Sequence, residues 1–111
     1  MTEDEIKKLF ADIRDFGWDP KKRDTILRGR EIDFDDMRFV LAGPTIIQRS
    51  DRKGEVRYKV FGFLDDVELV VICTLRGDLC WIITARRASR DERKRYHNRL
   101  PRRSAEGQDQ S

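Results

Sequence analysis

The sequence has few of the residues on which metal, redox and membrane sites depend. It contains two cysteines and one histidine in 111 residues, without a Cys-x-x-Cys motif, so a zinc site has no support. Its longest apolar run, Leu69–Cys73, is far too short for a membrane-spanning helix. The acidic start Met1–Glu5 lacks the cationic flank and apolar stretch of a signal peptide. We therefore expect a cytoplasmic protein without a metal ion, a cofactor or a membrane contact.

The two cysteines, Cys73 and Cys80, lie on either side of a predicted turn. If Arg76 and Gly77 form a two-residue hairpin turn, position 73 lies opposite position 80, close enough for a disulfide. In a chain without an export signal, however, two such cysteines are more often small buried hydrophobic residues than a disulfide or a redox pair. We favour two buried thiols.

Charge is abundant but almost balanced, with 24 basic and 21 acidic residues and a formal net charge of +3. Its distribution is uneven, because residues 1–20 carry a net charge of -3 and residues 86–111 carry +5. Such asymmetry points to an anionic partner at the C-terminal side. Nucleic acid is the first candidate for that partner and an acidic protein the second.

Helical patterns dominate the first half of the chain. An amphipathic helix is predicted within residues 1–15, where apolar residues recur at helical spacing: Ile6, Leu9, Phe10 and Ile13. Asp19 followed by Pro20 is a helix-start signal and predicts a helix over residues 20–27. Asp33 can cap a further helix over residues 34–41, and residues 16–18 form a short strand.

From residue 45 the apolar period changes to two, which is typical of strands. We expect strands over residues 45–48, 56–64, 67–74 and 79–85. The last two are nearly continuously apolar and should be central strands that helices cover. The predicted fold class is α+β in one domain, with an antiparallel sheet of four to five strands packed with N-terminal helices and a basic C-terminal helix.

The basic C-terminal helix should begin near Arg90. Ser89 and Glu92 match the capping box, in which each side chain satisfies a free backbone amide of the first turn. The helix has almost no apolar residues beyond Tyr96 and Leu100, so we expect something else to dock on it. From residue 101 the composition turns polar without periodicity, which predicts a disordered tail over residues 101–111.

Five short motifs in a fixed order resemble the BrnT toxins. The similarity covers about residues 16–97 and defines a BrnT-like domain over residues 16–100, with residues 1–15 as an extension. The motifs are Phe16-Gly17-Trp18-Asp19-Pro20-Lys21-Lys22, Ile32-Asp33-Phe34-Asp35-Asp36, Ala42-Gly43-Pro44-Thr45, Glu55-Val56-Arg57, and Trp81-Ile82-Ile83-Thr84-Ala85-Arg86-Arg87-Ala88-Ser89 with Glu92-Arg93 and Tyr96. The chain departs from the family at Ile26–Glu31, where many members have Asn-x-x-Lys-His-Gly, and at Trp81, where many have arginine.

The resemblance implies a RelE-like fold and the toxin half of a type II toxin-antitoxin pair. Family members are RNA endonucleases that inhibit translation. The implied partner besides RNA is a BrnA-like antitoxin, whose ribbon-helix-helix segment binds DNA and which can form a heterotetramer with the toxin.

Metal-independent RNA cleavage uses the 2′-hydroxyl as nucleophile, so its proton must be removed and the charge on the phosphorus centre stabilised. Arg86 and Arg57 are the predicted catalytic phosphate clamps, because guanidinium stays protonated and can hold two oxygens. Glu55, on the same predicted strand face as Arg57, is the predicted proton acceptor. His97 and Tyr96 are the alternatives.

The remaining basic residues around the predicted junction of strand and helix should bind RNA. The predicted RNA-binding residues are Arg87, Lys59, Arg90, Arg93, Lys94 and Tyr96. We further expect Trp18 and Trp81 in the core, and the acidic residues 3–15 as a cover over the basic site. Two alternatives to the active nuclease stay open. One is a module that binds RNA or a partner without cleaving it, and the other is a toxin inactivated by its departures from the family.

Overall fold

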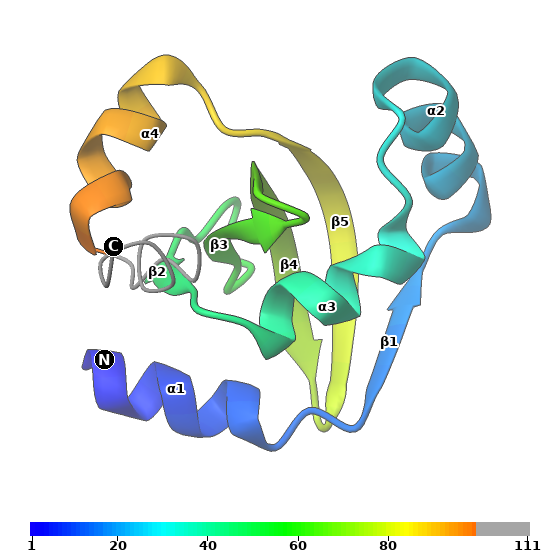
Figure 1. Cartoon of the computed structure of the whole chain (residues 1–111). Coiled ribbons are helices and arrows are strands. Elements are labelled where there is room, and N and C mark those ends of the chain that lie inside the picture. The colour runs from blue at the N-terminus through cyan, green and yellow to red at the C-terminus, as the bar shows by residue number, and fades with distance from the viewer. Residues whose placement is uncertain (100–111) are drawn as a thin grey trace.

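The computed structural model describes residues 1–99 and confirms the α+β class (Figure 1). The predicted tail, residues 101–111, lies outside the described residues. The elements follow one another as α1 (Glu3–Ala11), β1 (Asp15–Trp18), α2 (Pro20–Arg30), a 3₁₀ turn (Phe34–Asp36), α3 (Met37–Ala42), β2 (Ile46–Arg49), β3 (Tyr58–Leu64), β4 (Val67–Arg76), β5 (Leu79–Arg87), α4 (Arg90–Tyr96) and a 3₁₀ turn (His97–Arg99).

The helix starts agree with the capping signals of the sequence. The Asp19 side chain accepts a hydrogen bond from the Lys21 amide at the start of α2, and Ser89 and Glu92 form a complete capping box at the start of α4. Asp33 caps the 3₁₀ turn rather than an α-helix. The helix predicted over residues 34–41 is therefore divided into this turn and α3.

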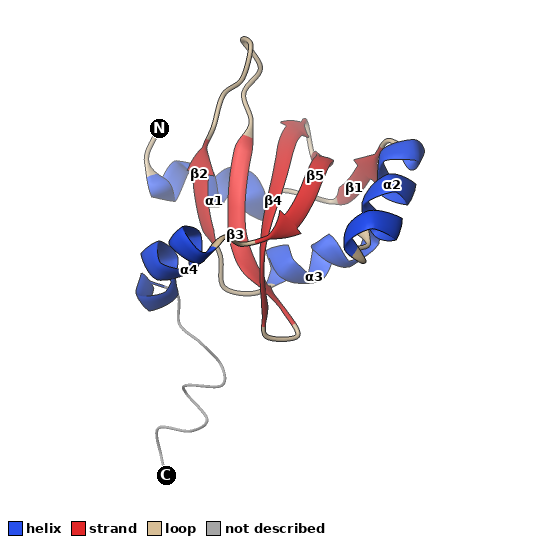
Figure 2. Ribbon diagram, turned by 90° about the horizontal axis from the view of Figure 1, so that it is seen from above, coloured by secondary structure: helices blue, strands red, loops and turns tan. Residues whose placement is uncertain are grey.

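The sheet has five strands in the order β1-β5-β4-β3-β2 (Figure 2). Strands β2 to β5 pair antiparallel, as predicted, whereas β1 pairs parallel to β5 with Asp15 beside Leu79 and Trp18 beside Ile82. The prediction of an antiparallel sheet is thus wrong for β1. This strand reaches the far edge of β5 from a distant part of the chain, so no hairpin fixes its direction.

The turn between β4 and β5 lies one residue later than predicted. Arg76 pairs with Leu79, and Gly77 takes a left-handed conformation with φ of 62°. Cys73 therefore lies opposite Ile82 rather than opposite Cys80. Both thiols are buried and free. A hydrogen bond with Cys80, together with burial, holds the pKa of the Cys73 thiol well above its ordinary value.

Two apolar clusters lie on opposite faces of the sheet, because neighbouring strand residues point to opposite sides. The first contains Ile6 of α1, Met37 and Val40 of α3, and Val60 and Val71 of the sheet, among others. The second contains Phe61, Val70, Ala88 and Tyr96. Figure 2 shows α1 and α3 passing behind the sheet, while α4 lies beside β2 and β3.

Helix α1 is part of the first cluster and does not cover the basic site. Ile6 is 5% exposed, and the ring of Phe10 meets that of Tyr58 edge to face at 5.2 Å. The predicted amphipathic helix is therefore present, but the prediction that it covers the basic residues is wrong. Its apolar stripe turns it to the face of the sheet that Arg86 does not occupy.

Candidate functional site

The face of the sheet opposite α1 and α3 carries a group of polar and basic side chains. Side chains alternate between the two faces along each strand, so Lys59 of β3, Arg76 of β4 and Arg86 of β5 lie on this face, opposite the first-cluster residues. Arg57 continues the same alternation two residues before Lys59. We call these four residues, Arg57, Lys59, Arg76 and Arg86, the basic face.

Glu92 of α4 reaches back onto the basic face and joins two of its cations. Arg86 donates to both oxygens of the Glu92 carboxylate, at 2.7 Å from Nη1 and 2.8 Å from Nη2. Lys59 Nζ lies 2.6 Å from Glu92 Oε2, and the Ser89 amide donates to Oε1 at 2.8 Å. One carboxylate therefore holds residues of β3 and β5 together with the start of α4.

The pKa of the Glu92 carboxyl is held well below its usual range. The hydrogen bonds from Arg86 are the largest cause, and Lys59 and the Ser89 amide act in the same direction against the effect of burial. The same carboxylate raises the pKa of the Arg86 guanidinium. Glu92 is consequently ionised and a poor proton acceptor, so it differs from the base that RNA cleavage needs.

Arg57 and Glu55 form a second ion pair in the long hairpin that precedes β3. Arg57 Nε donates to Glu55 Oε1 at 2.8 Å, and the side chains are 26% and 41% exposed. Both residues lie before the strand, which begins at Tyr58 and not at residue 56 as predicted. The Thr74 hydroxyl donates to the Val56 carbonyl at 2.8 Å, which ties this segment to β4.

Tyr96 lies in the second cluster, which corrects its predicted role as an RNA-binding residue. Its side chain is 2% exposed, and its hydroxyl donates to Gln48 Oε1 at 2.9 Å. Its ring packs against that of Phe61, with centroids 5.2 Å apart. A ring this buried offers no face on which a base can stack.

Lys59 belongs to the basic face, whereas the other predicted RNA-binding residues are exposed and lie apart from it. Arg87 pairs with Leu69, so it lies on the opposite side of β5 from Arg86. Arg90 and Lys94 are exposed on α4, and Arg93 lies 3.8 Å from Glu68. His97, an alternative proton acceptor, has its Nδ1 3.3 Å from Glu68 Oε2.

Two residues near the basic face were not predicted to belong to it. Arg30, at the end of α2, donates to the Ala85 carbonyl at 2.9 Å, one residue from Arg86. Trp81 is only half-buried, and the guanidinium of Arg76 lies over its ring at 4.7 Å. The Arg30 contact has no local sequence signal, because Arg30 and Ala85 are 55 positions apart.

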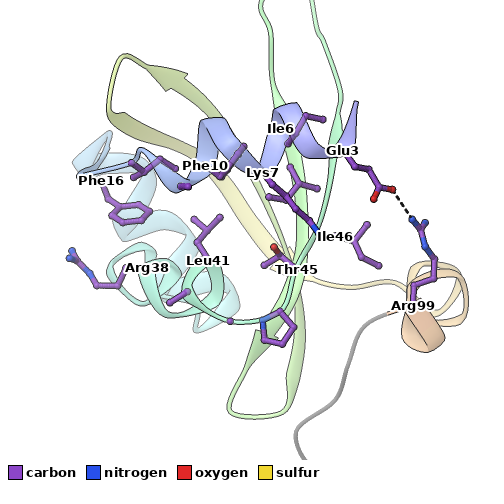
Figure 3. Close-up of a pocket in the computed structure, with 16 residues that line it drawn as sticks. Glu3, Ile6, Lys7, Phe10, Phe16, Arg38, Leu41, Thr45, Ile46 and Arg99 are labelled. Atoms are coloured by element: carbon purple, nitrogen blue, oxygen red, sulfur yellow. Dashed lines mark ion pairs between the residues drawn. The ribbon is translucent and has the colours of Figure 1, made fainter. Parts of the chain in front are cut away.

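A separate groove of about 670 Å³ lies between α1, α3 and β2 (Figure 3). Its lining includes Ile6, Phe10, Leu41 and Ile46, and an ion pair of Glu3 and Arg99 at 3.5 Å stands at one end. Most of its apolar lining belongs to the first cluster, Ile46 packs against the second, and no residue of the basic face lines the groove.

Within residues 1–99, no three His, Cys, Asp or Glu side chains gather to hold a metal ion. In the same part of the chain, no helix is long and apolar enough to cross a membrane.

A family model described as "Ribonuclease toxin, BrnT, of type II toxin-antitoxin system" matches residues 18–92, which is more than half of the chain. The chain belongs to the BrnT family. It is thus a ribonuclease toxin of a type II toxin-antitoxin system, with RNA as the substrate and a protein antitoxin as partner. No curated protein sequence matches the chain.

The match to the BrnT family includes the whole basic face and ends at Glu92. Helix α1 lies outside it, and so does most of α4. The ion-paired cluster of Lys59, Arg86 and Glu92 is therefore built within the region that the family shares. By contrast, the groove of Figure 3 owes one of its walls to the extension.

Proposed function

We propose that this BrnT-family toxin cleaves RNA internally, without a metal ion, on the basic face of the sheet. The observation that carries the proposal is the convergence of Lys59 and Arg86, from separate strands, on a single carboxylate at 2.6 to 2.8 Å. Two cations that can share one small anion can also share the oxygens of one phosphate. Arg86 would hold the scissile phosphate and stabilise the charge that develops on it.

In this proposal Arg57 is the second phosphate clamp and Glu55 removes the proton from the 2′-hydroxyl. The 2′-oxygen then bonds to phosphorus while the P–O5′ bond breaks, and the departing 5′-oxygen takes a proton from water. The Glu55 side chain is 41% exposed and lies 2.8 Å from Arg57, so a ribose beside an Arg57-bound phosphate can approach its carboxylate. Glu92 is the weaker choice of base, because four hydrogen bonds or ion pairs already occupy its two oxygens. Exposed Arg90, Arg93 and Lys94 would guide the rest of the RNA, with Arg87 at the end of β5.

The proposed biological outcome is inhibition of translation in the cytoplasm, relieved by a BrnA-like antitoxin. The antitoxin would carry a ribbon-helix-helix segment for DNA binding and form a heterotetramer with the toxin. An anionic surface on the antitoxin would suit the same cations that hold RNA, since charge complementarity across an interface speeds association and fixes the register of the partners.

The experiment that tests this proposal is incubation of the purified protein with RNA in excess EDTA. We expect internal cleavage that survives EDTA and is lost in Arg86→Ala. Arg38→Ala is the matched control, because Arg38 is also an ion-paired arginine, 2.6 Å from Asp35, but belongs to α3 on the other side of the sheet. Loss of cleavage in EDTA contradicts the metal-independent mechanism.

Two outcomes would favour the alternative functions. Tight binding of RNA that stays intact would indicate a module that binds RNA without cleaving it. Unhindered growth of cells that produce soluble protein without an antitoxin would indicate an inactive toxin. Trp81 and the Arg30-Glu31 segment, where the chain departs from the BrnT pattern, would then be the first positions to restore.

A further inference from the structure

The cluster around Glu92 has the form of an anion-binding site that is already filled. Both carboxylate oxygens are fully engaged, Oε1 by Arg86 and the Ser89 amide and Oε2 by Arg86 and Lys59. The Glu92 side chain is 10% exposed, whereas those of Lys59 and Arg86 are 25% and 38% exposed. The cations can thus be reached from solvent while the carboxylate lies beneath them.

The attachment of α4 does not depend on this carboxylate alone. Tyr96 fixes the other end of the helix through Phe61 and Gln48, and Arg93 donates to the Ala88 carbonyl at 3.3 Å. Glu92 is therefore held against Lys59 and Arg86 by a helix that has its own anchor. If α4 keeps its place, the carboxylate stays close to these two cations whether or not it is bonded to them.

The donors that hold Glu92 are the donors that a phosphate would use. A guanidinium offers two parallel N–H groups, and this fork fits two oxygens of a carboxylate or two oxygens of a phosphate equally well. Each N–H donates one strong hydrogen bond at a time, so the two anions exclude each other from the same edge of Arg86. The local charge of two cations against one carboxylate leaves one positive charge for a second anion.

We propose that Glu92 is a built-in competitor of RNA, an internal carboxylate that occupies the phosphate position on Arg86 and Lys59 and that the substrate must displace. This inference rests on the proposed function, because it takes Arg86 and Lys59 as phosphate contacts. Its consequence is selectivity. A lone phosphate ion gains too little binding free energy to displace a tethered carboxylate. An RNA strand that also binds Arg57 and α4 gains enough binding free energy to do so.

The test compares RNA binding by the intact protein and by Glu92→Gln. Glutamine keeps the shape and can still accept from Arg86 and the Ser89 amide, but it carries no charge. The probe is a single-stranded RNA of about ten nucleotides with 2′-O-methyl riboses, which lack the nucleophilic hydroxyl and so report binding alone. We expect at least a threefold lower Kd for Glu92→Gln at low salt, and inhibition of that binding by a lower concentration of inorganic phosphate.

Asp33→Asn is the matched control, because Asp33 is also a half-buried carboxylate that accepts two hydrogen bonds from one arginine, Arg23, and neither residue belongs to the basic face or to α4. It removes the same charge and should change the Kd by less than twofold. Equal or weaker binding by Glu92→Gln, in a variant whose circular dichroism matches the parent, would overturn the proposal and make Glu92 a positioning residue.

The two proposals fail separately. If Arg86→Ala still cleaves RNA like the parent, the proposed function is wrong whatever Glu92 does. If Arg86→Ala is inactive while Glu92→Gln binds no more tightly than the parent, the competitor role is wrong and the proposed nuclease site stands. Equal tightening in Glu92→Gln and Asp33→Asn would also overturn the competitor role, since the gain would then come from net charge.

Discussion

At the scale of single residues, two arginines near the turn between β2 and β3 form ion pairs of the same length but differ in expected function. Arg57 Nε pairs with Glu55 at 2.8 Å, and Arg49 Nε pairs with Asp51 at 2.8 Å. Arg57 lies on the basic face, whereas Arg49 belongs to the edge strand β2. Substituting each arginine in turn therefore separates the effect on cleavage of its position from the effect of losing one positive charge.

We expect Arg57→Ala to lower the rate of RNA cleavage by about 100- to 1,000-fold, the usual effect of removing one preorganised charge contact to a transition state. Arg49→Ala should lower it by less than about threefold, because a surface ion pair contributes only about 0 to 1 kcal/mol. Single-turnover cleavage rates of the two variants are the measurement. Similar losses in both variants would show that Arg57 has no special contact with the substrate.

The stability of the fold should depend on pH through Glu92. Its pKa is lower in the folded than in the unfolded protein, so its ion pairs stabilise the fold fully above the unfolded value, about 4.3, and this stabilisation is lost as the pH falls toward the folded value. The difference in free energy of unfolding between the parent and Glu92→Gln should thus be constant from about pH 7 to 5 and shrink below about pH 4.3.

Urea unfolding of both proteins at about pH 7, 5 and 3 measures this difference. Asp33 and Asp51 also have lowered pKa values, through their bonds to Arg23 and Arg49, but they are present in both proteins and cancel in the comparison. A difference that stays constant down to about pH 3 would mean that Glu92 contributes no ion-pair stabilisation.

Only part of the site could be predicted from single residues in the sequence. The capping role of Glu92 follows from its spacing to Ser89, because both partners lie within one helical turn. Its bonds to Arg86 and Lys59 do not follow, since Lys59 is brought beside β5 only by the pairing of β3 with β4 and of β4 with β5. The burial of Tyr96 was missed for a similar reason, because the Phe61 that covers it is distant in sequence.

At the scale of elements, α4 shows how a short polar helix can be held in place. Its seven residues bury only Glu92 and Tyr96, one at each end of the helix. Helices of this length are not stable alone in water, so these two contacts decide whether α4 forms. The expectation that something else docks on this helix stays a prediction, and within residues 1–99 the helix is already held by Glu92 and Tyr96.

We therefore expect Tyr96→Ala to destabilise the protein by about 3 to 5 kcal/mol, because it removes a buried ring from the second cluster. Tyr96→Phe should cost only about 0.5 to 1.5 kcal/mol, since it removes the hydrogen bond to Gln48 and keeps the ring. Denaturant unfolding of the two variants provides the comparison. Nearly equal losses of stability in the two variants would mean that the hydroxyl group, and not the ring, holds α4 in place.

Most helices and strands were predictable because their sequence signals are local. The errors arose where contacts between distant residues determine strand direction or register. The caps at Asp19 and Ser89 and the alternation along β3 are such local signals. The direction of β1 is set by its pairing with β5, which the sequence does not encode within a short window. The turn at Gly77 is displaced by one residue, an error that local alternation alone cannot exclude in nearly continuous apolar strands.

At the scale of the whole molecule, the sheet separates two surfaces of different chemistry. The face behind the sheet is closed by α1 and α3 and keeps the apolar groove (Figures 2 and 3). The other face gathers the cations of β3, β4 and β5. The net charge of +3 therefore understates the field that RNA meets. RNA approaching the basic face meets cations from several elements at once.

RNA binding should weaken steeply with salt. If RNA contacts Arg57, Lys59 and Arg86 together with Arg90, Arg93 and Lys94 of α4, about six phosphates are neutralised, and log Kobs should fall against log salt with a slope of about -4. The double variant Arg90→Ala with Lys94→Ala should reduce this slope by about 1.4. Titrations of a labelled 2′-O-methyl RNA over a range of salt give both slopes. An unchanged slope in the double variant would remove α4 from the RNA interface.

The parallel pairing of β1 with β5 also has a consequence for the order in which a ribosome produces a working toxin. Asp15 of β1 is synthesised 64 residues before its partner Leu79, which corresponds to about 3 to 13 s at about 5 to 20 residues per second. During that time the sheet lacks its second strand, and Arg86 and Glu92 do not yet exist. The nascent chain thus cannot assemble the ion-paired cluster of Lys59, Arg86 and Glu92 until Glu92 itself has been synthesised.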